Sequence, residues 1–356
     1  MATTYLTRTQ GTPTNNKIFT VSCWFQASQV ADEMKLIYSD DNSTNNYTYI
    51  HFSDTSGRIR FQNRNGGSNN TELIWENNIR DFSAFYNLVM AVDSTQTTAS
   101  DRVKFYLNGV QQTVLDSSAN TFPPSDQTFT LNSGGYGVDI GANGFNNNAY
   151  FRGVMSYFAF IDGTQELPTI FGETDSTTGQ WKLKTTITPS VAWGANGFLI
   201  LKDGNSLTDE SSNSNNFTLA AGTLTKTESC PDNVFATINP LNYQLSGCTL
   251  ANGNTSLTST GGDAWRTFYG TIAGSSGKFY WEQKITGASG SSHYIGISDI
   301  DESRNVNTND FENGGVSAYC YRADGGKVTS VSGSTVLTAG VGASFTTNDI
   351  IGIAMA

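Results

Sequence analysis

The stretch Phe19-Thr20-Val21-Ser22-Cys23-Trp24-Phe25 decides the fold class, because apolar and polar side chains alternate along it. Successive side chains of a strand point to opposite faces, so this period of two predicts a strand with one face in a core and one in water. Similar patterns occur at 49–52, 58–61 and 103–107. No helix is found, and 81–92 is interpreted as a loop that leads into a strand at Asn87–Val92. The chain is predicted to be all-β.

Asn-Gly pairs separate the predicted strands. This dipeptide accepts positive φ at both central positions of a tight hairpin turn. The clearest predicted hairpin joins Val103–Leu107 to Val110–Val114 through Asn108-Gly109. Short strands with frequent turns favour a sandwich or a barrel. The other pairs are Asn65-Gly66, Asn143-Gly144, Asn196-Gly197, Asn252-Gly253 and Asn313-Gly314.

The composition excludes several function classes. The 356 residues include 20 basic and 31 acidic ones, a formal charge of −11, and no basic cluster is visible. Such a chain repels nucleic-acid phosphates and anionic membrane surfaces. No run of 18 apolar residues occurs, and Met1–Gln10 lacks the pattern of a secretory signal. The four cysteines form no C-x-x-C pair, so we expect free thiols, with Cys23 in the core.

The segment 203–227 is rich in Asn, Ser, Thr and Asp and precedes a new series of aromatic strands. We therefore predict one domain over 1–220, a linker over 221–232 and a second domain over 233–356.

The first domain resembles the laminin-G/concanavalin A-like lectin sandwich. The resemblance is carried, in the family's order, by 19–25, by Tyr86–Asp93, by Arg102–Gly109 and by Val138–Gly141 with Phe151–Met155. It implies two stacked sheets, between which Trp24, Phe105, Ile140 and Phe158 would be buried.

Two further resemblances concern the rest of the chain. The segments 160–163, 171–173, 179–181, 194–198 and 209–217 (D-x-S-x-N-x-N-N-F) are similar to structural proteins of tailed, especially marine, bacteriophages. The last third resembles a SPRY domain at Gly277–Glu282, Tyr294–Ile297, Tyr319–Gly325 and Asn348–Ile353. Because the family's closing segment is not present before Ala356, we expect this second sandwich to be incomplete, with an unpaired edge and an open core.

Catalytic candidates are few. The two histidines, His51 and His293, lie in different predicted domains and lack a Gly-x-Ser-x-Gly partner, so structural roles are favoured. Some concanavalin-like glycosidases place three carboxylates on one strand as Glu-x-Asp-x-x-Glu. The nearest match here begins at Glu173-x-Asp175, but Thr178 replaces the last acid, and we expect no catalysis.

Binding candidates lie in predicted loops. Asp40-Asp41-Asn42, and Asp299 with Asp301-Glu302, could hold Ca²⁺, although solvated turn residues are the favoured interpretation and no cofactor is expected. Aromatic residues could stack on sugar rings, or could instead pack in a core or between subunits. These residues are Tyr136, Phe145, Tyr150 and Trp265.

The sequence thus predicts a non-enzymatic protein on the surface of a phage virion, synthesised in the host cytoplasm, as a tail fibre, head fibre or capsid decoration. We expect it to bind host-surface glycan through loops, to contact other capsid or tail proteins, and to form a homo-oligomer, as a trimer. Two alternatives remain open: a capsid cement without ligand binding, and a glycan-cleaving enzyme.

Overall fold

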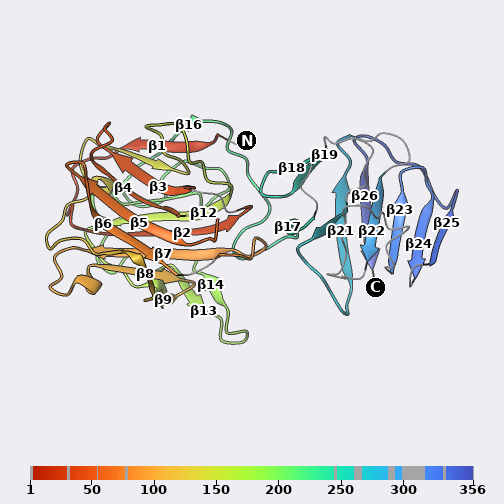
Figure 1. Ribbon diagram of the computed structural model, residues 1–356, viewed down its shortest axis with the longest axis horizontal. Coiled ribbons are helices and arrows are strands. Elements are labelled where there is room, and N and C mark those ends of the chain that lie inside the picture. Colours follow the sequence, from red (N-terminus) through yellow and green to blue (C-terminus); the bar gives the residue numbers. More distant parts are fainter. Residues whose placement is uncertain are drawn as a thin grey trace. The chain divides into compact units, whose positions relative to one another are not determined.

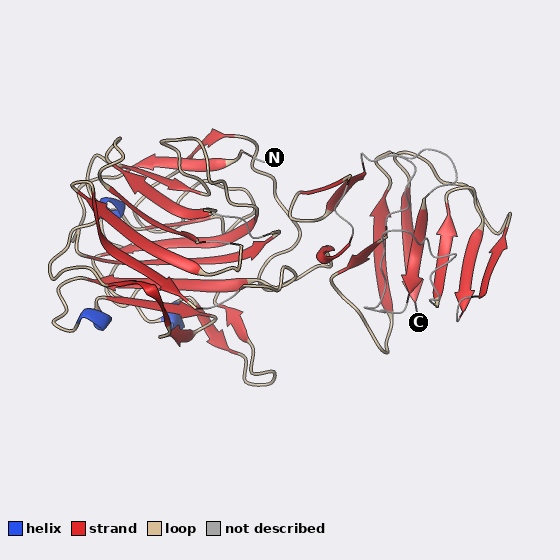
Figure 2. Cartoon of the chain, viewed as in Figure 1, coloured by secondary structure: helices blue, strands red, loops and turns tan. Residues whose placement is uncertain are grey.

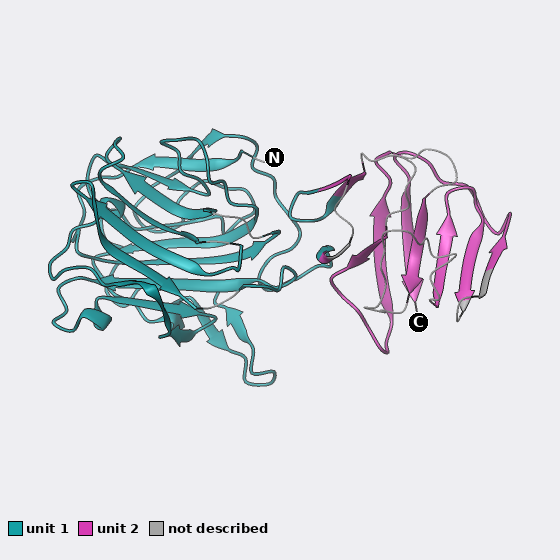
Figure 3. Cartoon of the chain, viewed as in Figure 1, with its two compact units in different colours: residues 1–240, 250–256 teal, residues 241–249, 257–356 magenta. Residues whose placement is uncertain are grey.

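A computed structural model describes residues 3–29, 33–53, 55–76, 79–243, 247–259, 267–287, 293–298, 317–331 and 334–355. The chain divides into two compact units, 1–240 with 250–256 and 241–249 with 257–356 (Figure 3). Residues 221–232, where the sequence predicts a linker, fall within the first unit. Strands dominate both units (Figure 2), which confirms the predicted all-β class. The helical elements of the described residues are the 3₁₀ turns η1 (Ala99–Asp101), η2 (Thr130–Asn132) and η3 (Pro168–Ile170).

None of the helical turns in this described part has the length and hydropathy needed to cross a membrane.

The first unit is a sandwich of two antiparallel sheets, and most of their strands are labelled in Figure 1. The eight-stranded sheet has the order β10 (Leu115–Thr121), β6 (Ser68–Trp75), β5 (Ile59–Asn65), β4 (Tyr47–Phe52), β3 (Lys35–Asp40), β11 (Gly137–Ile140), β1 (Tyr5–Thr9) and β16 (Thr218–Ala221). The six-stranded sheet has the order β15 (Phe198–Ile200), β12 (Gly153–Asp162), β2 (Ile18–Ala27), β7 (Tyr86–Asp93), β8 (Val103–Leu107) and β9 (Val110–Gln112).

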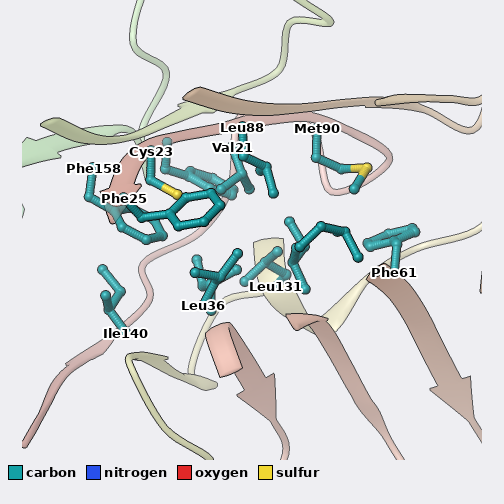
Figure 4. Packing of buried hydrophobic residues seen from close by; sticks show 14 of the residues in the cluster. Val21, Cys23, Phe25, Leu36, Phe61, Leu88, Met90, Leu131, Ile140 and Phe158 are labelled. Atoms are coloured by element: carbon teal, nitrogen blue, oxygen red, sulfur yellow. The ribbon is translucent and has the colours of Figure 1, made fainter. Parts of the chain in front are cut away.

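The core lies between the two sheets. Figure 4 shows Val21, Cys23 and Phe25 of β2 pointing toward Leu36 and Ile140 of the opposite sheet. Full burial of each such side chain stabilises the fold by about 1.5–3 kcal/mol relative to exposure. Alternate residues of β2 therefore supply the core, as the sequence pattern predicts.

The prediction for Trp24 is wrong. Because Cys23 and Phe25 point into the core, the intervening Trp24 points to the outer face of the six-stranded sheet, where it packs against Phe85 and Leu183. The expected water on this face is also wrong, since nearly every residue of β2 is buried.

The cover over this outer face comes from the segment that follows β12. Phe171 and Ile187 pack against Val89, Ala91 and Ile161. The hairpin of β13 (Gly172–Thr174) and β14 (Trp181–Leu183) belongs to the same segment. The central strands β2 and β7 of the six-stranded sheet are consequently buried on both faces.

Turn geometry confirms some of the predicted hairpins. Leu107 pairs with Val110, and Asn108 and Gly109 have φ of 49° and 77°, as the two-residue turn requires. Asn252 and Gly253 also have positive φ, of 53° and 63°.

Three other predicted turns are wrong or displaced, and one cannot be judged. In the β5–β6 hairpin Asn65 pairs with Ser68, so the turn residues are Gly66 and Gly67 rather than Asn65-Gly66. Asn143-Gly144 and Asn196-Gly197 form no positive-φ pair, because Asn143 and Asn196 are buried and hydrogen-bonded in longer loops. Asn313-Gly314 lies outside the described residues.

The segment 209–217 closes the first unit through hydrogen bonds. The Asp209 carboxylate accepts from the backbone N–H groups of Leu199, Ser211 and Asn215 at 2.7–2.8 Å. Asn213 and Asn215 donate to backbone carbonyls of the 194–197 loop. The segment ends at Phe217, whose ring lies 4.7 Å from that of Phe198 in the core. The residues of this motif therefore have a structural role, because their hydrogen bonds hold β15 and the loop before it in place.

The second unit contains smaller sheets. β21 (Phe279–Lys284) pairs with β26 (Ile350–Met355), and a four-stranded sheet has the order β22 (Tyr294–Ser298), β23 (Ala318–Arg322), β24 (Lys327–Val331) and β25 (Ser334–Thr338). Ile285, Ile295, Ala323 and Phe345 form its described buried cluster. An apolar groove beside this cluster is lined by Ile297, Tyr319, Ile353 and Met355, among others.

The remaining short strands form two-stranded sheets. They are β17 (Ile238–Tyr243) with β20 (Phe268–Gly270), and β18 (Cys248–Ala251) with β19 (Ser256–Ser259).

Candidate functional site

The outer face of the eight-stranded sheet carries the best candidate site. In β4, Ile50 and Phe52 are core residues, so Tyr47, Tyr49 and His51 point away from the core. The outer face of the other sheet is covered by residues of the segment 170–193, whereas Tyr47 on this sheet remains partly exposed.

Strand register aligns these outward residues into a row across the sheet. Each residue of the row is the cross-strand partner of the next, so their side chains lie side by side on one face. The row runs through Thr7, Asp139, Tyr38, Tyr49, Gln62, Glu72 and Thr121. A parallel row runs through Asp40, Tyr47, Arg64 and Asn69.

Three tyrosines stack at the centre of this surface. The ring centroids of Tyr47 and Tyr49 lie 5.4 Å apart, and that of Tyr38 lies 6.2 Å from Tyr47 and 6.3 Å from Tyr49. Tyr49 also donates a hydrogen bond to Gln62. We call this surface the tyrosine face, and it comprises Tyr38, Tyr47 and Tyr49 with Lys35, His51, Arg60, Gln62 and Arg64. Tyr38 and Tyr49 are buried beneath their neighbours, and Tyr47 is the partly exposed ring.

Basic side chains border the tyrosines. The Lys35 ammonium lies 3.8 Å from the centroid of Tyr49 and 3.0 Å from Nδ1 of His51. A charged ammonium can only donate, so Nδ1 of His51 accepts and Nε2 carries the proton. That Nε2–H is buried and has no hydrogen-bond partner. Arg60 forms an ion pair with Glu72.

Burial dominates the electrostatics of this surface. It lowers the pKa of Lys35 to about 8, with Glu33 opposing the shift and Arg60 adding to it. It lowers the pKa of His51 well below the usual value, and the charges of Lys35 and Arg60 act in the same direction. It raises the pKa of Asp139 to about 6, against hydrogen bonds from Thr7 and Gly144. His51 is therefore neutral at pH 7, whereas Lys35 is mostly charged.

One loop brings two of the predicted aromatic candidates to the end of this face. Phe145 is exposed in the 143–150 loop, and the Tyr150 ring lies 6.2 Å from that of Tyr5. The Gly144 N–H donates to the Asp139 carboxylate at 3.1 Å, which anchors the loop to the central row. Tyr136 precedes β11, at the other end of that strand, so the structure does not join it to the loop. Trp265 lies outside the described residues.

The acidic candidates for Ca²⁺ are used in a turn. Asp40 Oδ1 accepts from the N–H of Asn42, and the two oxygens of Asp41 accept from Ser43 and Asn46 at 2.6 Å. Asp299, Asp301 and Glu302 lie outside the described residues. Within the described ranges, no three or more His, Cys, Asp or Glu side chains are grouped so that they could hold a metal ion.

The catalytic candidates do not form an acid–base pair. Glu173 and Asp175 both lie within 3.4 Å of the Lys182 ammonium on an exposed hairpin. Hydrogen bonds from the backbone of Thr178 and Thr177 and from Lys182 lower the pKa of Asp175 to about 2, whereas a general acid needs a raised one. His51 and His293 lie in different units.

The sequence analysis missed the tyrosine face as a site. A usable signal is present in β4, where Tyr47, Tyr49 and His51 alternate with buried apolar residues. Which strands lie beside β4, and hence that Tyr38 and Arg64 join the group, is visible only in the fold.

A family match agrees with the architecture of the first unit. Residues 1–170 match the model of a family described as the concanavalin A-like lectin/glucanases superfamily. No curated protein matches the chain.

Several solved structures are similar to this chain. A putative carbohydrate binding protein from Bacteroides ovatus is 13% identical with a TM-score of 0.40, over 64% of this chain and 58% of that one. Domains LG4-5 of the mouse laminin alpha1 chain are 9% identical with a TM-score of 0.35, over 99% and 69%. A heptameric SAP-like pentraxin from Limulus polyphemus is 16% identical with a TM-score of 0.33, over 45% and 70%.

Proposed function

We propose that the protein binds glycan through the tyrosine face and does so without catalysis. The observation that carries this proposal is the stacked tyrosine group, which ends in the partly exposed ring of Tyr47. Sugar rings have an apolar face that packs on an aromatic ring and hydroxyl groups that bond to amides and carboxylates. The match of residues 1–170 to a superfamily that includes lectins supports the same function.

The surroundings of Tyr47 suit such a ligand. The 41–46 turn and the Gly66-Gly67 turn are joined by a hydrogen bond from the Gly66 N–H to the Asn46 side chain at 2.7 Å. Exposed amide side chains of Asn42, Asn45 and Asn69 lie on or beside these turns. They offer both donors and acceptors to hydroxyl groups.

We propose that the protein belongs to the virion surface of a tailed bacteriophage, as a tail fibre, head fibre or capsid decoration that attaches to host glycan. The resemblance of 160–163, 194–198 and 209–217 to phage structural proteins supports this role. We further propose that the last third of the chain, which resembles a SPRY domain, is a second binding module. In a homo-oligomer such as a trimer, held by other virion proteins, weak single sites would gain strength through avidity.

A glycan array tests the binding function. The wild-type protein is expected to bind a defined set of host-envelope glycans, and Tyr47→Ala is expected to weaken that binding about tenfold, because it removes the stacking ring. Tyr280→Ala is the matched control, since Tyr280 is an exposed tyrosine of the second unit. Equal binding by wild type and Tyr47→Ala would place the site elsewhere.

Whole host cells test the attachment role. The purified oligomer is expected to pull down envelope polysaccharide, and failure to bind any host-envelope component would remove the adhesion function.

A further inference from the structure

Arg64 differs from Arg58, Arg60 and Arg102 in the first unit. Its guanidinium carbon lies 5.9 Å from the ring centroid of its cross-strand partner Tyr47. Nε of Arg64 is buried without a hydrogen-bond partner, and within the described residues the side chain makes no ion pair. By contrast, Arg58 and Arg60 form ion pairs with Asp116 and Glu72, and Arg102 donates to three backbone carbonyls.

The nearby acids do not neutralise Arg64. Glu72, on the neighbouring strand, is paired with Arg60. Asp40 lies two strands away, with Tyr47 between the two residues in the register, and accepts from the N–H of Asn42. A partly buried cation without a partner costs free energy, and an anionic ligand recovers that cost. The chain as a whole carries 31 acidic residues against 20 basic ones.

We propose that Arg64 binds the carboxylate or sulfate of an acidic sugar whose ring packs on Tyr47. This inference rests on the proposed glycan-binding function and narrows it to anionic glycans. A guanidinium donates two parallel hydrogen bonds to a carboxylate or a sulfate, and a neighbouring ring fixes the orientation of the sugar. Arg60, which is already paired, serves to position the face and does not bind the anion.

Matched pairs of oligosaccharides test the inference. One pair consists of a uronic-acid oligosaccharide and its carboxyl-reduced neutral form, and the other of a sulfated oligosaccharide and its desulfated form. Titration calorimetry with the full chain measures Kd for each member. We expect the wild type to bind the acidic member about tenfold more tightly, which is the gain from one charge-assisted contact. The pair that shows this difference identifies the anion.

Three variants separate the contact from general electrostatics. Arg64→Gln is expected to remove the preference, so that the Kd values for the acidic and the neutral member become about equal. Arg64→Lys keeps the positive charge but lacks the two parallel N–H donors of a guanidinium, so it should retain part of the preference. Arg80→Gln, at an exposed arginine outside the sheets, changes the net charge equally and should bind as wild type does. Thermal unfolding of each variant checks that the fold is intact.

The outcomes are distinct. Equal binding of both members by the wild type, or equal weakening of both by Arg64→Gln, overturns the inference and leaves glycan binding intact. A loss of preference in Arg80→Gln as large as in Arg64→Gln also overturns it. If no member of either pair binds and the glycan array is blank as well, the proposed function fails together with the inference.

Discussion

His51 shows how a polar residue on an outward face of a strand can be fully buried. Its ring lies 4.5 Å from that of Tyr49, and Lys35 and Arg60 are its cross-strand partners. The Lys35 ammonium lies 3.0 Å from Nδ1 of the imidazole, and none of the His51 side chain is exposed to water. The residue must therefore be neutral in the folded protein, although an exposed histidine would be protonated in mild acid.

This lowered pKa predicts acid sensitivity. Below about pH 6.5 the unfolded chain binds a proton at His51 that the folded chain does not, so stability is lost as pH falls toward the lowered folded pKa. The expected slope for one such group is about 1.4 kcal/mol per pH unit. Urea denaturation between pH 7 and pH 5 measures the free energy of unfolding.

His51→Gln is the matched variant, because glutamine can still accept from Lys35 and does not titrate. Asp139 acts in the opposite sense, since its raised pKa stabilises the folded state as pH falls below about 6. Asp139 is present in both proteins, so its effect cancels in the difference between the unfolding free energies of wild type and His51→Gln. If this difference in unfolding free energy does not change with pH, the claim that His51 is buried in its neutral form is wrong.

The alternation of single residues was predictable where one face is core, as at Val21, Cys23 and Phe25. The sequence could not show what covers the opposite face. Trp24 was assigned to the core between the sheets because its cover, at Leu183, comes from a segment some 160 residues later. The tyrosine face was missed for a related reason, since it is assembled from neighbours on three strands.

Among the elements, the strands were more predictable than the turns. Period-two patterns located β2, β4, β5 and β8 because side-chain alternation is a local property of each strand. The Asn-Gly rule located the β8–β9 turn but misplaced the β5–β6 turn by one residue, because Asn65 there extends the strand pairing. Asn196 was misread because its buried side chain bonds to Gly11 and Asn132.

The 209–217 segment gives a sharp prediction at this scale. Asp209→Ala leaves three backbone N–H groups without their acceptor in a buried site, so we expect the free energy of unfolding of the first unit to fall by about 2–4 kcal/mol. Asp203→Ala, at an exposed aspartate six residues earlier, should change it by less than about 0.5 kcal/mol. Denaturant titration measures the free energy of unfolding of both variants. Similar losses in the two would show that the Asp209 carboxylate does not stabilise the first unit.

For the whole molecule, the two units differ in how they are built. The first has a continuous core between large sheets, whereas the described core of the second is the small cluster around Ile295 and Phe345. Exposed apolar side chains such as Tyr319, Val336 and Ile350 accompany that small core. Less burial of apolar surface provides less stability.

Differential scanning calorimetry should therefore resolve two transitions, with the second unit melting first. Asp209→Ala identifies the transitions, because it should lower only the melting temperature of the higher one. A single transition in the wild type, or a shift of both by Asp209→Ala, would show that the units unfold as one body.

The position of β1 has a consequence for biosynthesis. This strand leaves the ribosome before its partners β11 and β16, and β16 ends at Ala221. At about 5–20 residues per second, translation delivers the second partner roughly 10–45 s after the first strand. The apolar strand β2 also waits, until β12 has been synthesised as far as Asp162, and we expect the emerging polypeptide to bind chaperones during these intervals.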